Sequence, residues 1–282
     1  MESEAGRDAA AWSTARIDEL VGIRAGQAGH GLDAAVGQMY QATIQHLPAA
    51  PCTVLDVGCG TGILADVMNG LGYETLGIDI NSDAMSTMTS PHQVGSVAAL
   101  PFDREAFEVV VANEILEHLP VTLYGAGIME MARVAGRRII VTVPNAEALD
   151  SSTTRCPECG CVYSSHGHVR RFEPRQMASL FPGFALIHLA TAGPYKLRHR
   201  SIEWYVRRRL LGRWPAAPGR TCPQCGARQQ PASSRKASDD SRLRRVVKLL
   251  AGVPWKRWWI VAVYERVGGG MAAGTAPARD GP

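Results

Sequence analysis

The stretch that most limits how this chain can fold reads DVGCGTG over residues 56–62. It lies between an apolar run at 53–57, typical of a buried strand, and a helical pattern over about 63–71. Its alternating glycines permit a tight turn and let a ligand approach the backbone closely. Asp79 ends the next predicted strand, where a carboxylate can accept hydrogen bonds from the hydroxyls of a ribose. Together these features predict a nucleotide-binding α/β sheet.

The rest of the chain continues this alternation of strands and helices. Further strands are predicted at 74–79, 93–97, 108–113, 138–143, 184–191 and 258–266, and helices at 9–21, 32–47, after Asn81 or Ser82, near 122–134 and at 174–181. Strands that alternate with helices at this spacing form a parallel sheet covered on both faces. The fold class is therefore predicted to be α/β.

Several motifs follow the glycine turn in a fixed order. They are Leu76-Gly-Ile-Asp79, Leu100-Pro-Phe102, Phe107-Glu-Val-Val-Val-Ala-Asn113, Glu114-Ile-Leu-Glu117-His118-Leu119 and His168-Val-Arg-Arg-Phe172. This series resembles the class I S-adenosylmethionine (SAM) methyltransferases over roughly residues 50–195 and 258–267. The resemblance implies a Rossmann-like, seven-stranded sheet with an antiparallel last strand, and it implies methyl transfer from SAM.

The resemblance also implies which residues bind SAM. Asp56, Gly58, Gly60, Gly62 and Asn113 would lie at its methionine end, Asp79 at its ribose, and Ile80, Ser96 and Val97 at its adenine. The chain departs from the family at one place. Family members often carry Gly-Asp-Ala before Leu-Pro-Phe, with the aspartate bonded to the adenine amine, whereas this chain has Gly95-Ser96-Val97.

Four of the seven cysteines form two similar units, Cys156-Pro-Glu-Cys159-Gly and Cys222-Pro-Gln-Cys225-Gly. Each unit has the form of a zinc knuckle, in which a two-residue gap lets both thiolates reach one ion. The units fall in two insertions, 150–165 and 196–257. If the resemblance holds, both insertions leave carboxyl ends of strands, where open α/β sheets bind ligands. We therefore expect one structural Zn²⁺ to join them into a substrate-binding cap, with Cys161 as a bystander.

Charge is divided unevenly along the chain. Residues 1–195 hold 11 Lys/Arg against 21 Asp/Glu, whereas residues 196–257 hold 17 against 3. The basic segment, with predicted helices at 201–211 and 241–251, could bind nucleic acid or could pack on the acidic body of the same protein. Both interpretations stay open at the level of sequence.

Three histidines are candidates for general-base catalysis. His166 and His168 end the first insertion and border the expected pocket, and His166 is the first choice; His118 is the third candidate. A second interpretation joins Glu114, Glu117, His118 and His168 with the segment Pro144-Asn-Ala-Glu147. This pattern is similar to the metal-binding pattern of small-RNA 2′-O-methyltransferases, in which Mg²⁺ or Mn²⁺ would lower the pKa of a substrate hydroxyl.

These features divide the chain into an N-terminal helical lid (1–50), a SAM-methyltransferase domain (51–267) with the zinc-pinned cap, and a disordered tail (268–282). The acceptor is predicted to be an oxygen or nitrogen nucleophile of a small molecule, such as a secondary metabolite; the alternative is RNA bound by the basic cap. A zinc-ribbon binding module without enzymatic activity is the third interpretation, disfavoured by the intact glycine turn. Apolar runs are too short for a membrane span and the first residues are acidic, so we expect a cytoplasmic protein.

Overall fold

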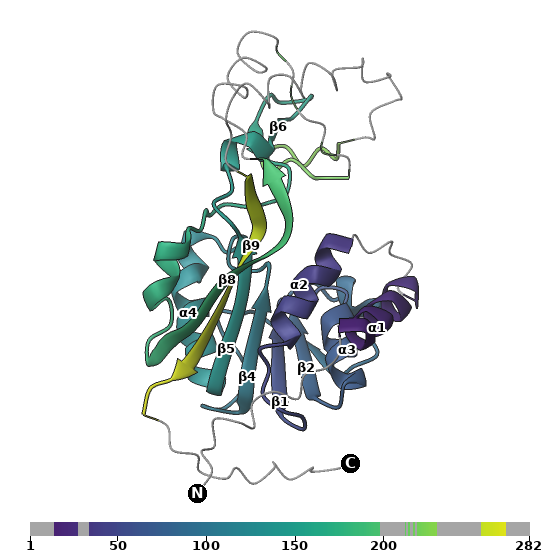
Figure 1. Ribbon diagram of the computed structural model, residues 1–282. Helices are drawn as coiled ribbons and strands as arrows, with labels where there is room; N and C mark the ends of the chain where they lie inside the picture. Colours follow the sequence, from purple (N-terminus) through teal and green to yellow (C-terminus); the bar gives the residue numbers. More distant parts are fainter. Residues whose placement is uncertain are drawn as a thin grey trace, which may run out of the picture.

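The computed structural model describes residues 14–27, 34–197, 212, 214, 217, 219–229 and 255–268. Its main element is a seven-stranded sheet in the order β3-β2-β1-β4-β5-β9-β8 (Figure 1). The strands are β1 (Thr53–Val57), β2 (Glu74–Asp79), β3 (His92–Val94), β4 (Phe107–Asn113), β5 (Ala135–Pro144), β8 (Phe184–Leu197) and β9 (Trp255–Arg266). Strands β1 to β5 are parallel, and β9 pairs antiparallel with β5 and β8. The predicted Rossmann-like fold is confirmed.

The central strands are apolar on both faces because helices cover both faces. Successive side chains of a strand point to opposite sides, so Leu55 and Val110 join one core cluster while Val54 and Val111 join another. The first cluster packs under α4 (Val121–Val134), and the second packs under α1 (Thr14–Gln27), the end of α2 (Ala34–Ile44) and α3 (Ile63–Gly70). Burying each such side chain contributes about 1.5–3 kcal/mol. The sheet is thus a rigid support for the loops at its edges.

Helix α1 differs from its predicted bounds. It continues to Gln27 through Gly22 and Gly26, where the sequence predicted a break after residue 21. Ile17 and Val21 are buried against the second core cluster. Packing of this apolar stripe outweighs the cost of about 1 kcal/mol that each interior glycine adds.

Two predicted helices are shorter than the sequence suggests. The segment after β2 forms only a 3-10 turn, η2 (Ala84–Thr87), although the Asn81 side chain does accept the backbone N–H groups of Asp83 and Ala84. The segment after Phe172 is the 3-10 helix η4 (Pro174–Ser179). Strand β3 ends at Val94 and not at residue 97, because the chain then forms a turn in which the N–H of Ala99 donates to the carbonyl of Ser96.

The first insertion leaves the carboxyl end of β5, as predicted. It contains the 3-10 helix η3 (Leu149–Ser152) and a two-stranded antiparallel sheet of β6 (Thr153–Arg155) and β7 (Val162–Ser164). In Figure 1 this part lies beyond the upper ends of β8 and β9. The predicted helices at 201–211 and 241–251 lie outside the described residues. Among those described, no helix combines the length and apolar character that crossing a membrane requires.

A pair of histidine rings, tilted relative to each other, joins the turn after α2 to strand β8. The ring centroids of His46 and His188 are 4.2 Å apart, and Arg138 donates a hydrogen bond to the carbonyl of His46. Burial, followed by His188 and Arg138, lowers the pKa of His46 to about 4. Because an unfolded histidine titrates near 6.5, the unfolded chain binds more protons between these values.

We therefore expect the stability that His46 contributes to be present above pH 6.5 and lost as the pH falls toward 4. Urea midpoints measured at pH 7 and pH 5 for the wild type and His46→Gln check this. The variant should lose less stability over this interval than the wild type. Equal losses in the two proteins would show that His46 does not contribute to the pH dependence.

Candidate active site

The glycine turn lies between β1 and α3, where its backbone contacts the next strand. The N–H groups of Gly58 and Cys59 donate to the carbonyl of Ile78 at 2.8 and 3.2 Å. The N–H of Gly60 donates to Oδ2 of Asp79 at 2.9 Å. The turn and the acidic strand end that the sequence singled out are therefore joined directly.

The three glycines of the turn all have positive φ, but their surroundings differ. A Cβ atom at Gly58 would lie 2.8 Å from Ile115, and one at Gly62 would lie 2.3 Å from Met88. A Cβ at Gly60 would meet no atom within 4 Å. Gly58 and Gly62 are thus required by packing, whereas Gly60 borders open space that a ligand can occupy.

Asp56 lies beneath this turn at the end of β1. It is buried, and its Oδ2 atom has no hydrogen-bond partner among the described residues. Burial, followed by repulsion from Asp79, raises the pKa of Asp56 to about 7. The pKa of Tyr40 on α2 is also raised, by burial first and then by Asp56 and Glu114. An unpartnered carboxylate oxygen here fits the positive ammonium group at the methionine end of SAM.

The residues expected at the ribose and adenine line the next part of the edge. Oδ1 of Asp79 accepts the N–H of Asn81 at 2.8 Å, and Ile80 is 75% exposed, free to cover a ring. The Ser96 hydroxyl accepts the N–H of Ala98 at 3.2 Å, while Val97 is buried in the core. The groups that Ser96 and Val97 could offer to an adenine are therefore mainly their backbone N–H and carbonyl groups.

Asn113 ends β4 and is held by the N-terminal helices. Its side-chain N–H donates to Oγ1 of Thr43 on α2 at 3.0 Å. This contact links the predicted lid to the edge where the methionine end of SAM is expected.

A cluster of carboxylates and imidazoles follows Asn113 directly. We call Glu114, Glu117, His118 and His168 the acceptor cluster. One ligand atom each from Glu117, His118 and His168 lies within 4.8 Å of the others. The rings of His118 and His168 meet edge to face, with centroids 4.7 Å apart. The segment forms a turn before α4, not the first helical turn that the sequence suggested, because the helix begins only after Pro120.

The carboxylates of the acceptor cluster are buried. Glu117 is completely buried, and neither of its oxygens has a hydrogen-bond donor among the described residues. Burial raises the pKa of Glu114 and of Glu117, and the neighbouring Glu114 raises that of Glu117 further. Burial, followed by His168, lowers the pKa of His118. Without a cation, the site thus favours protonated carboxyls and a neutral imidazole.

The backbone at the two strand ends beside the acceptor cluster is strained. Glu114 has φ of 55° and Ala146 has φ of 50°, values that residues other than glycine rarely adopt. Such strain costs about 1–3 kcal/mol per residue and concentrates at functional sites. Here it turns the chain at the ends of β4 and β5, from which Glu114 and Glu147 extend.

Glu147 fixes the orientation of His168. Its Oε2 atom pairs with Nδ1 of His168 in a short contact. The other ring nitrogen, Nε2, remains for the acceptor cluster. His166, the first-choice base from sequence, is exposed and lies farther out, with its ring centroid 5.6 Å from that of His168.

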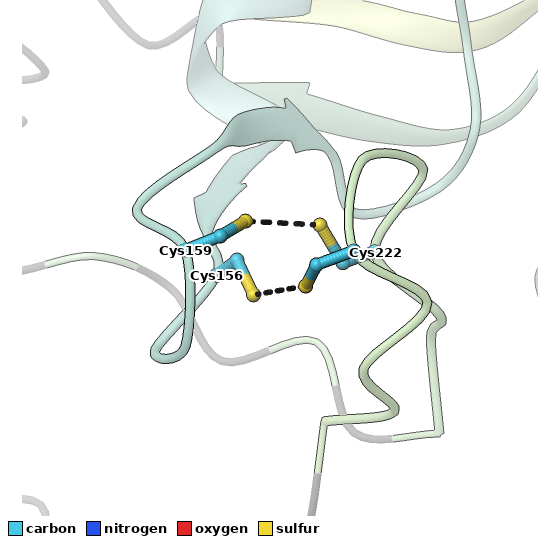
Figure 2. A group of neighbouring side chains, drawn as sticks. Cys156, Cys159 and Cys222 are labelled. Atoms are coloured by element: carbon cyan, nitrogen blue, oxygen red, sulfur yellow. Dashed lines mark hydrogen bonds between the residues drawn. The ribbon is translucent and has the colours of Figure 1, made fainter.

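The two cysteine units come together, as predicted. Figure 2 shows their loops facing each other, with Sγ–Sγ distances of 3.6 Å for Cys156–Cys225 and for Cys159–Cys222. All four sulfurs lie within 4.8 Å of one another, and none forms a disulfide. Sulfurs about 2.3 Å from one tetrahedral ion lie about 3.8 Å apart. The cysteine group is thus compatible with a zinc site.

The two units also repeat the same backbone hydrogen bonds. Gly160 donates to the carbonyl of Cys156 and Gly226 to that of Cys222, both at 3.0 Å. Buried Gln229 adds a second link between the insertions, because its side-chain amide donates to Thr154 at 3.3 Å and to the Tyr163 hydroxyl at 3.0 Å. Gln229 thus joins the two insertions in addition to the cysteine group.

The family assignment follows from the sequence over most of this region. Residues 31–189, more than half of the chain, match the family model described as a methyltransferase domain. The chain belongs to this methyltransferase family. The matched residues include the glycine turn and the acceptor cluster described above.

The curated relatives match only part of this methyltransferase. A ubiquinone biosynthesis O-methyltransferase of Albidiferax ferrireducens is 44% identical over 89 residues, which cover 27% of this chain and 35% of the relative. A ribosomal protein L11 methyltransferase of Cupriavidus pinatubonensis is 38% identical over 111 residues, 37% of each chain. The chain thus spans about a third of the length of these relatives.

A solved structure supports the fold. A Haloferax volcanii methyltransferase, in complex with the Trm112 methyltransferase activator, has a TM-score of 0.51 and 15% identity over 88% of this chain and 97% of its own. At this identity the likeness shows the fold alone.

Sequence reasoning missed three residues of the site. Tyr40 from α2 lies near Asp56, Trp259 from β9 hydrogen-bonds Glu114, and Arg220 from the second insertion reaches the edge of the acceptor cluster. Tyr40 and Trp259 resemble ordinary core aromatics in sequence, and their place depends on long-range pairing. For Arg220, its position two residues before Cys222 was the one available signal.

The methyltransferase should depend on Asp79 for cofactor binding. Asp79→Ala removes the acceptor of the Gly60 N–H and the expected acceptor of both ribose hydroxyls. At about 1.5–3 kcal/mol for each hydrogen bond to a charged group, we expect the affinity for S-adenosylhomocysteine to fall about thirtyfold or more. Calorimetry on this variant and on Asp83→Ala, an exposed aspartate in the next turn, measures the effect. A normal affinity in Asp79→Ala would exclude the ribose contact.

Proposed function

We propose that this methyltransferase methylates a hydroxyl oxygen of a small molecule and that the acceptor cluster activates this hydroxyl. The observation that supports the proposal best is Glu117, whose two buried oxygens have no hydrogen-bond donor within the described part of the chain and which lies beside His118 and His168. A buried carboxylate without a partner is unfavourable, so it holds either a proton or a cation. Either state would suit a site that removes the proton of a substrate hydroxyl.

Four side chains of the cluster, those of Glu114, Glu117, His118 and His168, would hold Mg²⁺ or Mn²⁺. Carboxylate oxygens suit these cations, and imidazole suits Mn²⁺ as well. The Glu147 contact supports this assignment, because a ligating histidine usually donates its other N–H to a carboxylate. When bound, such a cation lowers the pKa of a hydroxyl at the site.

The surrounding residues position the reactants and exclude water. Asn113 and Glu114 are adjacent in sequence, so the acceptor cluster adjoins the expected methionine end of SAM. Trp259 bonds Glu114 and packs against Met39 of α2, closing the site from the side of the lid. Holding two reactants in line is the main requirement of methyl transfer, and it can supply about 7–11 kcal/mol of the barrier.

The small-molecule acceptor is supported by the relatives named ubiquinone biosynthesis O-methyltransferase, over the part of the chain that they match. A secondary metabolite stays a prediction from the sequence. Oxygen is favoured over nitrogen because a neutral amine needs neither a cation nor a buried base to react. The four cysteines would hold a structural Zn²⁺ that keeps the cap in place without taking part in the chemistry, since four thiolates leave no open coordination position.

RNA is the second candidate acceptor. The acceptor cluster has the residues of the pattern found in small-RNA 2′-O-methyltransferases, and ligand atoms of three of them, Glu117, His118 and His168, lie within 4.8 Å of one another. The basic segment 196–257 could bind the phosphates of such a substrate, although most of it lies outside the described residues.

One experiment tests the proposal and separates the two acceptors. The protein is incubated with methyl-labelled SAM and an extract of its host, with EDTA or with added Mg²⁺ or Mn²⁺. Label should enter small molecules. Its transfer should stop in EDTA and resume when Mg²⁺ or Mn²⁺ is added. Transfer that EDTA leaves unchanged would contradict the role of the cation. Label in RNA, with transfer that falls steeply as salt rises, would favour the second candidate.

A further inference from the structure

We infer that Arg220 binds an anionic group of the acceptor molecule, a phosphate or a carboxylate, beside the acceptor cluster. This inference rests on the proposed function and names a property of the substrate: the hydroxyl that is methylated belongs to a molecule that also carries an oxyanion. The residue comes from the second cysteine unit, which is distant in sequence from the cluster.

The backbone of Arg220 is held firmly by the cap. Its N–H donates to the carbonyl of Ala217 at 3.1 Å, and its carbonyl accepts the N–H of Gln229 at 2.9 Å. Gln229 in turn bonds the first insertion through Thr154 and Tyr163. Two residues later, Cys222 joins the cysteine group. Every one of these contacts fixes where the Arg220 side chain starts.

From this position the guanidinium extends to the acceptor cluster. One of its nitrogens donates to the carbonyl of His166 at 3.5 Å. Arg220 is exposed, and its guanidinium lies beside His166, whose ring centroid is 5.6 Å from that of His168 in the acceptor cluster.

Among the described residues, the side chain of Arg220 makes few contacts that stabilise the fold. Arg155 and Arg228 of the same cap bond the carbonyls of Gly160 and Gly219, which close their own turns. Within the described part of the chain, no carboxylate pairs with Arg220. A guanidinium has five donors in a planar fork that matches carboxylate and phosphate oxygens. Among the described residues, only one hydrogen bond uses these donors, the one to the carbonyl of His166.

A positive charge at this rim would offset repulsion between an anionic substrate and whichever carboxyl groups of the site are ionised. Glu114, Glu117 and Glu147 place three carboxyl groups close together, and they would repel an anionic substrate when ionised. An uncharged substrate would need no arginine there. A guanidinium on the open side of the cluster offsets this repulsion and orients the substrate by its anionic end.

The test uses inorganic phosphate and acetate as probes, each titrated separately into the zinc-containing protein without Mg²⁺ or Mn²⁺. The imidazole ¹H–¹⁵N signals of His118 and His168 report binding, with sodium chloride at equal ionic strength as the reference. We expect a saturable shift with at least one probe. In Arg220→Ala the affinity should fall about tenfold, as for loss of a charge-assisted hydrogen bond. Arg228→Ala, a matched arginine of the same hairpin, should bind like the wild type.

The relative affinities of the two probes indicate which anionic group the substrate carries. Tighter binding of phosphate indicates a phosphate ester, and tighter binding of acetate indicates a carboxylate. Absence of a saturable shift with both probes, or equal affinity in Arg220→Ala and the wild type, would overturn the assignment of Arg220. Since this titration involves neither a divalent cation nor methyl transfer, such a result would leave the proposed hydroxyl methylation standing. That proposal fails separately, through transfer that is insensitive to EDTA.

Discussion

Replacing Glu117 with glutamine is expected to weaken Mn²⁺ binding at least about a hundredfold and to reduce methyl transfer by a similar factor or more. The glutamine has nearly the same volume, so the packing of this completely buried side chain is kept. It removes the negative charge that would bind the cation, and a buried pair that loses one partner commonly costs about 3–5 kcal/mol. Calorimetry or electron paramagnetic resonance measures the Mn²⁺ affinity of the complex with S-adenosylhomocysteine.

A matched control separates this effect from a general loss of charge. Glu74 begins β2 at the opposite edge of the sheet and is exposed. Glu74→Gln should therefore bind Mn²⁺ like the wild type, and both variants should bind S-adenosylhomocysteine normally. Unchanged Mn²⁺ affinity in Glu117→Gln would contradict the assignment of the acceptor cluster to a cation.

The variant Cys225→Ser is expected to lose its zinc almost completely. The wild type should contain about one zinc per chain when purified without a chelator, because four thiolates surround one position. Loss of the ion would leave the two insertions joined by Gln229 and a few other contacts, so the cap should also become more sensitive to protease. Zinc is measured by mass spectrometry of the metal, and cleavage by limited proteolysis.

The neighbouring thiol provides the control for zinc. Cys161 is two residues from Cys159 but lies outside the group of four converging sulfurs. Cys161→Ser should therefore keep its zinc. A zinc content near zero in the wild type would refute the zinc site, and equal losses in the two variants would refute the choice of ligands.

The sequence predicted the sheet because its signals are local. The apolar runs of β1 and β4, the glycine turn and Asp79 each carry their meaning within a few residues, and the motif order placed them in one sheet. The bounds of β8 and β9 were harder to predict from the sequence. Both strands extend beyond the predicted residues, to Leu197 and back to Trp255, because they pair with each other there. Such long-range pairing leaves no local pattern.

Part of the site was also predictable, because its signals are local in the sequence. The two cysteine units have a spacing that is specific to metal ligation, so their approach could be anticipated. By contrast, the ranking of the histidines rested on their positions in the sequence alone. His166 borders the site, but Glu147 orients His168, and the turn before α4 brings His118 to it. These relations depend on strained residues at two strand ends, which the sequence does not reveal.

The central claim is that the methionine end of SAM and a divalent cation bind side by side at the ends of β1 and β4. Paramagnetic relaxation tests it directly. Mn²⁺ is added to the protein bound to ¹³C-labelled S-adenosylhomocysteine, and the relaxation of the bound ligand's protons is measured. We expect the homocysteine protons to relax much faster than the adenine protons. Relaxation unchanged by Mn²⁺, or enhanced most at the adenine, would contradict the claim.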